Sequence, residues 1–197
     1  MIAYLNGTIQ HKCPTYFIIE VNGVGYQVHV SLNTYSKLQN STACKIFTHL
    51  HIQEDAHTMY GFADELERQI FLYLISISGV GPSTARMVLS SMAPEDVQQA
   101  IAHERADLLE KVKGIGPKTA KRIVLELKDK MLKVTDASNL AWAAPGGVGS
   151  HKQEALSALV ALGFAKQQSE NAINKVLTKA PDLDSVEAII KAALQAL

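Results

Sequence analysis

The chain has 197 residues, of which 47% are hydrophobic and 19% are charged, and its formal net charge is zero. This composition is typical of a globular protein of one to three domains, so any affinity for nucleic acid must come from where the charges lie. The chain has no apolar run of the ~20 residues that a membrane-spanning helix needs, and its first residues do not resemble a signal peptide. We therefore expect a cytoplasmic protein without membrane contact, in which Cys13 and Cys44 are reduced.

Residues 1–63 have the pattern of a small β-barrel. Residues 16–21 are rich in β-branched and aromatic side chains, and Asn22-Gly23 is typical of a turn before the next alternating run. Near the N-terminus, Asn6-Gly7 predicts the turn of an earlier hairpin. Five or six short strands with tight turns fit an oligonucleotide/oligosaccharide-binding (OB) type of barrel. The expected strands are residues 2–5, 8–10, 16–21, 26–30, 45–52 and 58–62, with a helical turn at 32–38.

Two adjacent carboxylates, Glu54 and Asp55, stand at the tip of the predicted hairpin between the last two strands. From residue type alone, a solvated turn explains them best, because Asp is common in turns. A metal site would need further ligands, and the alternating histidines at 49, 51 and 57 do not complete a ligand set. We expect no metal and no cofactor.

Residues 64–133 change to helical spacing and contain one motif twice, 35 positions apart. Residues 79–88 (GVGPSTARMV) align without a gap with residues 114–123 (GIGPKTAKRI). Glycine permits a tight turn with positive φ, and proline suits the first position of the helix that follows. The free amides at such a helix N-terminus suit a phosphate, so the pair predicts two contacts with a nucleic-acid backbone that do not read base sequence. The alternative is an ordinary helix–helix connection in an all-α bundle.

Charge favours the nucleic-acid interpretation, mainly for the second copy. Between residues 111 and 133, eight basic and two acidic side chains give a net charge of +6, which is more than the mixed charge of a solvated helix face. The first copy is weaker, because Ser83 stands where the second has Lys118 and Arg86 is its one nearby cation. The predicted DNA contacts are Gly79, Val80, Gly81, Ser83, Thr84, Arg86, Gly114, Ile115, Gly116, Lys118, Thr119, Lys121 and Arg122.

The last third of the chain divides into a linker and a helical bundle. Residues 134–150 are rich in alanine and glycine and carry one charge, which is typical of a flexible linker; Trp142 within it receives no role. Residues 151–197 predict three short helices, with Leu162-Gly163-Phe164 as a turn like that of a ubiquitin-associated (UBA) bundle. A bundle on a tether is usually a partner-binding module, although a stabilising cap is an alternative.

The order of these parts resembles the RuvA family of bacterial Holliday junction branch-migration proteins. The resemblance covers essentially the whole chain and rests on residues 1–7 (MIAYLNG), 24–28 (VGYQV), 60–62 (YGF), 78–82 (SGVGP) and 113–120 (KGIGPKTA). It implies a multidomain α+β fold with an OB-type barrel, a tandem helix-hairpin-helix domain and a UBA-like bundle. The expected bounds are 1–63 for the barrel, 64–133 for the tandem domain, 134–150 for the linker and 151–197 for the bundle.

The resemblance also implies a function in recombination and DNA repair, as part of the DNA-damage (SOS) response. A homotetramer, or an octamer on DNA, would hold a four-way junction open and square, with Glu54 and Asp55 as an acidic pin beside the junction centre. This role replaces the solvated turn that residue type alone favours for these two carboxylates. The bundle would bind and regulate the hexameric ATPase RuvB, with the resolvase RuvC in a larger complex. Many family members have lysine at the position of Ser83, so the first hairpin is expected to have one cationic phosphate ligand fewer. Candidate partner contacts are Leu159, Leu162, Phe164 and Ile189.

Two rival functions remain open at this point. Helix-hairpin-helix pairs also occur in structure-selective nucleases and glycosylases, but a nuclease needs carboxylates around a metal, and the acidic run at 64–67 is better explained as a helix N-terminus. An adaptor whose bundle binds peptides is the second rival. The chain has no Gly-x-x-x-x-Gly-Lys-[Ser/Thr] phosphate loop, so we expect a non-catalytic protein that leaves ATP hydrolysis to its partner.

Overall fold

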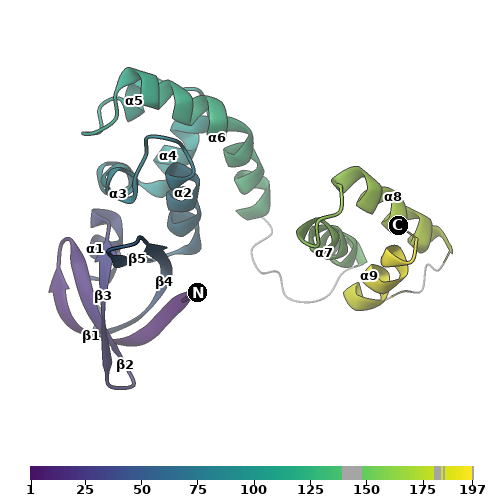
Figure 1. Cartoon of the computed structure of the whole chain (residues 1–197), viewed down its shortest axis with the longest axis horizontal. Coiled ribbons are helices and arrows are strands. Elements are labelled where there is room, and N and C mark those ends of the chain that lie inside the picture. The colour runs from purple at the N-terminus through teal and green to yellow at the C-terminus, as the bar shows by residue number, and fades with distance from the viewer. Residues whose placement is uncertain (139–147, 180–182, 184, 197) are drawn as a thin grey trace. The chain divides into compact units, whose positions relative to one another are not determined.

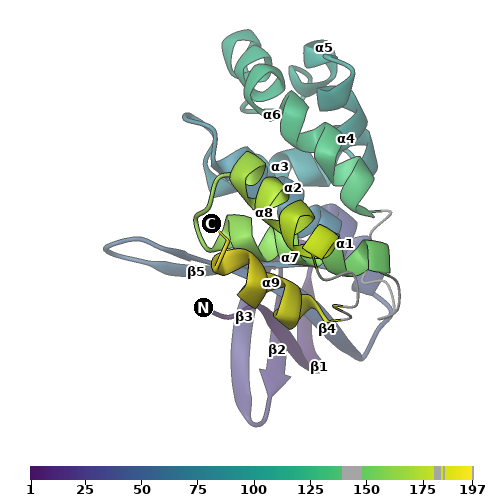
Figure 2. The same ribbon diagram turned by 90° about the vertical axis from the view of Figure 1, so that its right-hand side faces the viewer.

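The computed structural model describes residues 1–138, 148–179, 183 and 185–196. The chain forms two compact units, Met1–Asn139 and Leu140–Leu197. The first unit contains a β-barrel and a helical domain, and the second is a helical bundle (Figures 1 and 2). Among the described residues, no helix is both long and apolar enough to cross a membrane.

The N-terminal part is a closed barrel of five strands in the order β1-β2-β3-β5-β4, which confirms the predicted OB-type barrel. Neighbouring strands are antiparallel, except that β3 and β5 are parallel. Alternate side chains such as Phe17, Ile19 and Ile46 fill the interior. The elements are β1 (Tyr4–Cys13), β2 (Tyr16–Val21), β3 (Val24–Val30), α1 (Leu32–Leu38), β4 (Ala43–Ile52) and β5 (His57–Phe62).

The predicted turn at Asn6-Gly7 is wrong, because β1 runs straight through these residues. Gly7 pairs with Cys44 of β4. A Cβ atom at Gly7 would lie 2.1 Å from the carbonyl oxygen of Glu20 in β2, which no side chain could tolerate. The glycine therefore permits close packing inside the barrel and does not mark a turn.

The helical domain follows directly and shares a core with the barrel. It consists of α2 (Glu65–Ile75), α3 (Pro82–Ser91), α4 (Pro94–Ala102), α5 (Ala106–Leu109) and α6 (Pro117–Ser138). Phe71 of α2 packs on Tyr60 and Phe62 of β5, with ring centroids 5.1 Å and 4.9 Å apart. This aromatic contact is continuous with the core of the helical domain, so the barrel and the helices form one unit.

The C-terminal unit is a bundle of α7 (Val148–Ala161), α8 (Lys166–Lys179) and α9 (Val186–Leu194), as the sequence predicts. Its core includes Leu159, Ile173 and Ile189. The predicted linker differs from the structure at both ends, because α6 continues to Ser138 and α7 begins at Val148. Residues 134–138 and 148–150 are mostly weak helix formers, which favours a linker, but extending a helix that already exists needs no new nucleus, so the bordering helices continue through them. Trp142 and the other residues from 139 to 147 lie outside the described residues.

Candidate nucleic-acid interface

The two Gly-x-Gly-Pro segments have the same backbone structure. In each copy, the amide of the residue between the glycines donates to a carbonyl three residues earlier, and the first alanine of the helix donates to the carbonyl of the second glycine. The pairs are Val80 to Ile77 and Ala85 to Gly81 at 3.0 Å each, and Ile115 to Val112 at 3.1 Å and Ala120 to Gly116 at 2.9 Å.

The glycines of each turn have two different physical roles. Gly79 and Gly114 have φ of 90° and 96°, which is the left-handed region where other residues are strained. Gly81 and Gly116 have no positive φ, and no atom of the described residues lies within 4 Å of a Cβ built on either. The fold therefore requires glycine at the first position of each pair, whereas at the second the missing side chain leaves open space beside a helix N-terminus.

The side chains between the glycines anchor the turns. Val80 and Ile115 are both buried in the core of the helical domain. As predicted DNA contacts, these two residues can therefore contribute only their backbone. At the start of α3, no side chain of the described residues caps the helix, so the amides of Ser83 and Thr84 are available to an external acceptor.

The two turns lie next to each other. Arg122 on α6 donates through Nη1 to the carbonyl oxygen of Ser78, at 3.1 Å, in the first turn. Thr84 on α3 is the nearest neighbour of Gly114 in the second turn, 3.9 Å from the position of a Cβ there. Each motif thus lies beside the turn of the other, and we call the two turns with the helix N-termini that follow them the paired-hairpin surface (residues 78–84 and 113–122).

Only part of the predicted positive charge belongs to this surface. Lys111, Lys113, Lys118 and Lys121 are exposed around the second turn. By contrast, Lys128 forms an ion pair with Glu104, and Lys130 lies 5.8 Å from the ring centroid of Tyr73. The side chain of Lys133 is outside the described part of the structure. The cationic part of the surface therefore comes from the second motif.

The side chain of Arg86, a predicted DNA contact, lies against the barrel. Its Nη1 lies 3.2 Å from the carbonyl oxygen of Thr15, to which it donates, and 3.3 Å from Nδ1 of His29. Both partners belong to the barrel. Burial and the neighbouring Arg86 lower the pKa of His29, which favours a neutral ring whose Nδ1 accepts a hydrogen bond. The guanidinium is therefore engaged with the barrel, and the first motif has no free cation at this position.

The acidic pair Glu54 and Asp55 lies at an exposed hairpin tip, as predicted. Four residues connect β4 to β5, and the amide of Gln53 donates to the carbonyl of Ala56 at 2.8 Å. The hairpin extends away from the body of the barrel (Figure 2). Within the described ranges, no three His, Cys, Asp or Glu side chains are grouped so that they could hold a metal. The tip therefore presents two exposed carboxylates to solvent.

Sequence reasoning missed the role of Glu67, because it treated the whole acidic run as a helix N-terminus. Asp64 does cap α2, accepting from the amide of Glu67 at 2.8 Å. Glu67 itself is fully buried, and its carboxylate accepts hydrogen bonds from the hydroxyls of Ser31 and Thr34, the latter at 2.7 Å. Burial raises the pKa of Glu67, against the effect of these two hydrogen bonds. The spacing Asp-x-x-Glu is a capping-box signal, but it does not show that the glutamate faces the barrel.

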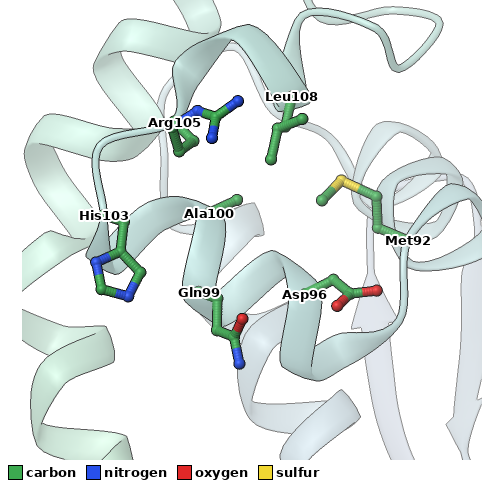
Figure 3. A pocket seen from close by; sticks show the side chains of 7 residues that line it. All are labelled: Met92, Asp96, Gln99, Ala100, His103, Arg105 and Leu108. Atoms are coloured by element: carbon green, nitrogen blue, oxygen red, sulfur yellow. The ribbon is translucent and has the colours of Figure 1, made fainter.

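A surface hollow of about 470 Å³ lies beside α4 and α5 (Figure 3). Its polar wall includes Arg105, whose guanidinium is held by Asp107 through two hydrogen bonds of 2.9 Å. None of the predicted DNA contacts or acidic-tip residues lines it. The hollow therefore shares no lining residue with the predicted DNA contacts or the acidic tip. Its lining residues are Met92, Asp96, Gln99, Ala100, His103, Arg105 and Leu108.

The predicted partner contacts of the bundle divide into two groups. Leu159 and Ile189 are 0% and 1% exposed, so they belong to the bundle core and cannot contact a partner directly. This part of the prediction is wrong, because helical spacing alone does not separate the core side of a small bundle from its surface. Leu162 and Phe164 are 62% and 36% exposed and remain candidates.

Three family models match the chain. Residues 1–61 match the RuvA N terminal domain, residues 71–129 a SAM-like helix-hairpin-helix tandem, and residues 150–197 the RuvA C-terminal domain. The matches leave out the segment between the tandem and the C-terminal domain. They follow the same order as the barrel, the paired hairpins and the bundle.

Curated relatives match over the full length. The chain is 48% identical over 197 residues to a protein of Christiangramia forsetii, with 100% of both chains covered. It is 46% identical over 197 residues to a protein of Cytophaga hutchinsonii, covering 99% of each chain, and 43% identical over 202 residues to one of Bacteroides fragilis, covering 100% of each. Each of these relatives is named Holliday junction branch migration complex subunit RuvA. The chain therefore belongs to the RuvA family.

Proposed function

We propose that the protein binds four-way DNA junctions through their structure and not their sequence, holds them open, and delivers them to an ATP-driven motor for branch migration. The observation that carries this proposal is the open space at Gly81 and Gly116, beside two helix N-termini that lie side by side. At such a place, backbone amides can approach a phosphate closely, and the helix dipole favours its negative charge. Contacts of this kind position a protein on DNA without reading bases.

The acidic tip supports selectivity for a junction. In the homotetramer that we propose, four copies of Glu54 and Asp55 surround the point where the arms meet. Their negative charge repels phosphates, so the strands there are kept apart while the paired-hairpin surfaces hold the arms. A continuous duplex laid across the same place would bring its phosphates against these carboxylates. The pin therefore acts mainly by penalising the wrong DNA structure.

The protein has no catalytic role in this proposal. Its sequence has no phosphate loop for ATP, and we assign hydrolysis to a hexameric motor of the RuvB type. The exposed Leu162 and Phe164 of the bundle are the proposed contacts with this motor, since large apolar side chains on a surface are typical of docking sites. A RuvC-type resolvase would join the same complex on the junction.

A competition binding assay tests the proposal. A labelled four-way junction is bound to the protein, and unlabelled junction or linear duplex of equal length competes in the presence of Mg²⁺, after which the strands are examined for cleavage. We expect duplex to compete far less well than junction, with all strands intact. Equal competition would overturn the junction proposal, and cut strands would favour the nuclease alternative.

A further inference from the structure

Arg86 and Lys121 occupy equivalent positions in the two hairpin motifs, 35 residues apart, but their surroundings differ. Arg86 on α3 is bonded to the barrel through the Thr15 carbonyl at 3.2 Å and faces His29 Nδ1 at 3.3 Å. Lys121 on α6 is exposed, and no ion pair involving it is found among the described residues. The duplicated motif therefore has one cation directed to the protein and one directed to solvent.

The acceptors of Arg86 are fixed parts of the barrel. The carbonyl of Thr15 lies in the turn between β1 and β2 and also accepts a hydrogen bond of 3.1 Å from the amide of Val30. The ring of His29 lies between Tyr16 and Tyr60, with centroids at 6.4 Å and 6.0 Å. A hydrogen bond to these groups thus connects α3 to strands whose positions are set by the closed sheet.

A second set of hydrogen bonds holds the C-terminal end of α3. The side-chain amide of Asn33, on α1, donates to the carbonyls of Leu89 and Met92, at 2.6 Å and 2.8 Å. The amide of Leu32 donates to the hydroxyl of Ser90 at 3.1 Å. Helix α3 lies beside α1 (Figure 1), and hydrogen bonds tie it to the barrel and α1 at its middle, through Arg86, and at its C-terminal end. By contrast, the bonds of α6 from Arg122 to Ser78 and from Lys128 to Glu104 remain within the helical domain.

We propose that Arg86 is a positioning residue, which fixes the direction of α3 and so the place of the first hairpin relative to the Glu54–Asp55 tip, and thereby sets selectivity for junctions over duplex. Lys121 supplies charge to the DNA instead. This inference rests on the proposed function. A duplex can bind to one paired-hairpin surface wherever that surface points, but a junction must meet the hairpins and the tip together. A change in the angle between the hairpins and the tip therefore weakens binding to a junction more than binding to a duplex.

Arg86→Gln and Lys121→Gln form a matched pair, because each removes one positive charge at the same place in its motif. The dissociation constants for junction and for duplex are measured over a series of salt concentrations. We expect Arg86→Gln to lower the junction-to-duplex affinity ratio about tenfold, which is ~1.4 kcal/mol, without changing the salt dependence for duplex. We expect Lys121→Gln to weaken both DNAs in parallel, with a salt slope that is shallower by up to about 0.9 for each phosphate that is no longer neutralised.

Asn33→Ala gives an independent test, because it releases the far end of α3 without any change in charge. It should lower the affinity ratio in the same direction as Arg86→Gln. Hydrogen exchange of the free protein gives a readout without DNA: Arg86→Gln should speed exchange in residues 76–81 and leave 111–116 unchanged. If Arg86→Gln instead behaves like Lys121→Gln, or leaves the ratio unchanged, the positioning role is overturned. If the unaltered protein does not prefer junctions, the proposed function fails, whereas the exchange result still tests the tie to the barrel.

Discussion

Arg122 donates a hydrogen bond of 3.1 Å to the main-chain carbonyl of Ser78, so that the helix of the second hairpin motif holds the turn of the first. The guanidinium is also 4.0 Å from Glu126, which keeps it on the surface of α6. Because the two turns are joined in this way, the spacing between the two proposed phosphate contacts is fixed before DNA arrives. Such preorganisation lowers the entropy cost of binding a second phosphate after the first.

The charge difference between the two hairpins predicts how variants at Lys118 and Ser83 change the salt dependence of DNA binding. Lys118→Gln should weaken binding to junction and duplex alike and make the slope of log affinity against log salt shallower by about 0.9 for each phosphate that its ammonium group neutralises, because fewer counterions are released. Ser83→Lys, at the equivalent position of the first motif, should have the opposite effect. Titrations at several salt concentrations measure both. A slope that does not change in either variant would show that these positions do not contact phosphates.

The buried carboxylate of Glu67 predicts a dependence of stability on pH. Its native pKa is raised by burial above the unfolded value, so between these values the folded protein binds more protons than the unfolded chain. The free energy of unfolding should therefore fall as the pH rises through this interval. Glu67→Gln removes the titration and should flatten the curve, measured by denaturant unfolding between about pH 4 and pH 8.

The exposed Glu110→Gln is the control for this experiment, and it should keep the slope of the unaltered protein. Glu67→Ala should cost about 1–3 kcal/mol, because it leaves the hydroxyls of Ser31 and Thr34 without their acceptor in a buried place. Identical pH profiles for Glu67→Gln and the unaltered protein would contradict the assignment of the titration to Glu67.

The acidic tip is expected to affect discrimination between junction and duplex DNA. Glu54→Gln with Asp55→Asn should tighten duplex binding and lower the junction-to-duplex ratio about tenfold, or ~1.4 kcal/mol, since the carboxylates no longer repel a continuous duplex. Glu95→Gln with Asp96→Asn removes the same charge from an acidic pair in the first turn of α4 and is the control. Gel-shift titrations with both DNAs make the comparison. The tip has no role as a pin if both double variants change the ratio equally.

The bundle offers a comparison between a core leucine and a surface leucine. Leu159→Ala should destabilise the bundle by about 2–5 kcal/mol, because it leaves a cavity among tightly packed side chains. Leu162→Ala should change stability by less than about 0.5 kcal/mol and still weaken binding to the motor. Thermal unfolding and calorimetric titration with a RuvB-type ATPase separate the two effects. Motor binding that is unaffected by Leu162→Ala would exclude this residue from the contact.

Local signals explain what could be predicted from the sequence. The alternating strand runs, Asn22-Gly23 and the two Gly-x-Gly-Pro turns depend on neighbours in the chain, and the structure has them where they were expected. Gly7 shows the limit of such signals. Glycine beside asparagine is typical of a turn, but here it is required by a strand that pairs alongside, and this contact is invisible in the local sequence.

The surroundings of Arg86 and Glu67 could not be predicted for the same reason. Arg86 follows a helix N-terminus like its counterpart Lys121, and only the packing of α3 against the barrel directs its guanidinium away from the hairpin surface. Glu67 is in a capping-box position, and Ser31 and Thr34, at the start of α1, supply the two hydroxyls that bind its buried carboxylate. In both cases the decisive partner is distant in the chain, and no pattern within either motif identifies it.

Alanine at the two open glycines tests whether DNA phosphates approach the backbone at the paired-hairpin surface. Gly81→Ala with Gly116→Ala places a methyl group where we propose that phosphates approach, and Gly79→Ala with Gly114→Ala is the comparison, because it strains two residues of positive φ. We expect the first double variant to unfold at the same temperature as the unaltered protein but to bind junctions at least about tenfold more weakly, and the second to lose about 1–2 kcal/mol of stability per site. Unchanged junction affinity in Gly81→Ala/Gly116→Ala would show that phosphates do not approach the backbone at these glycines.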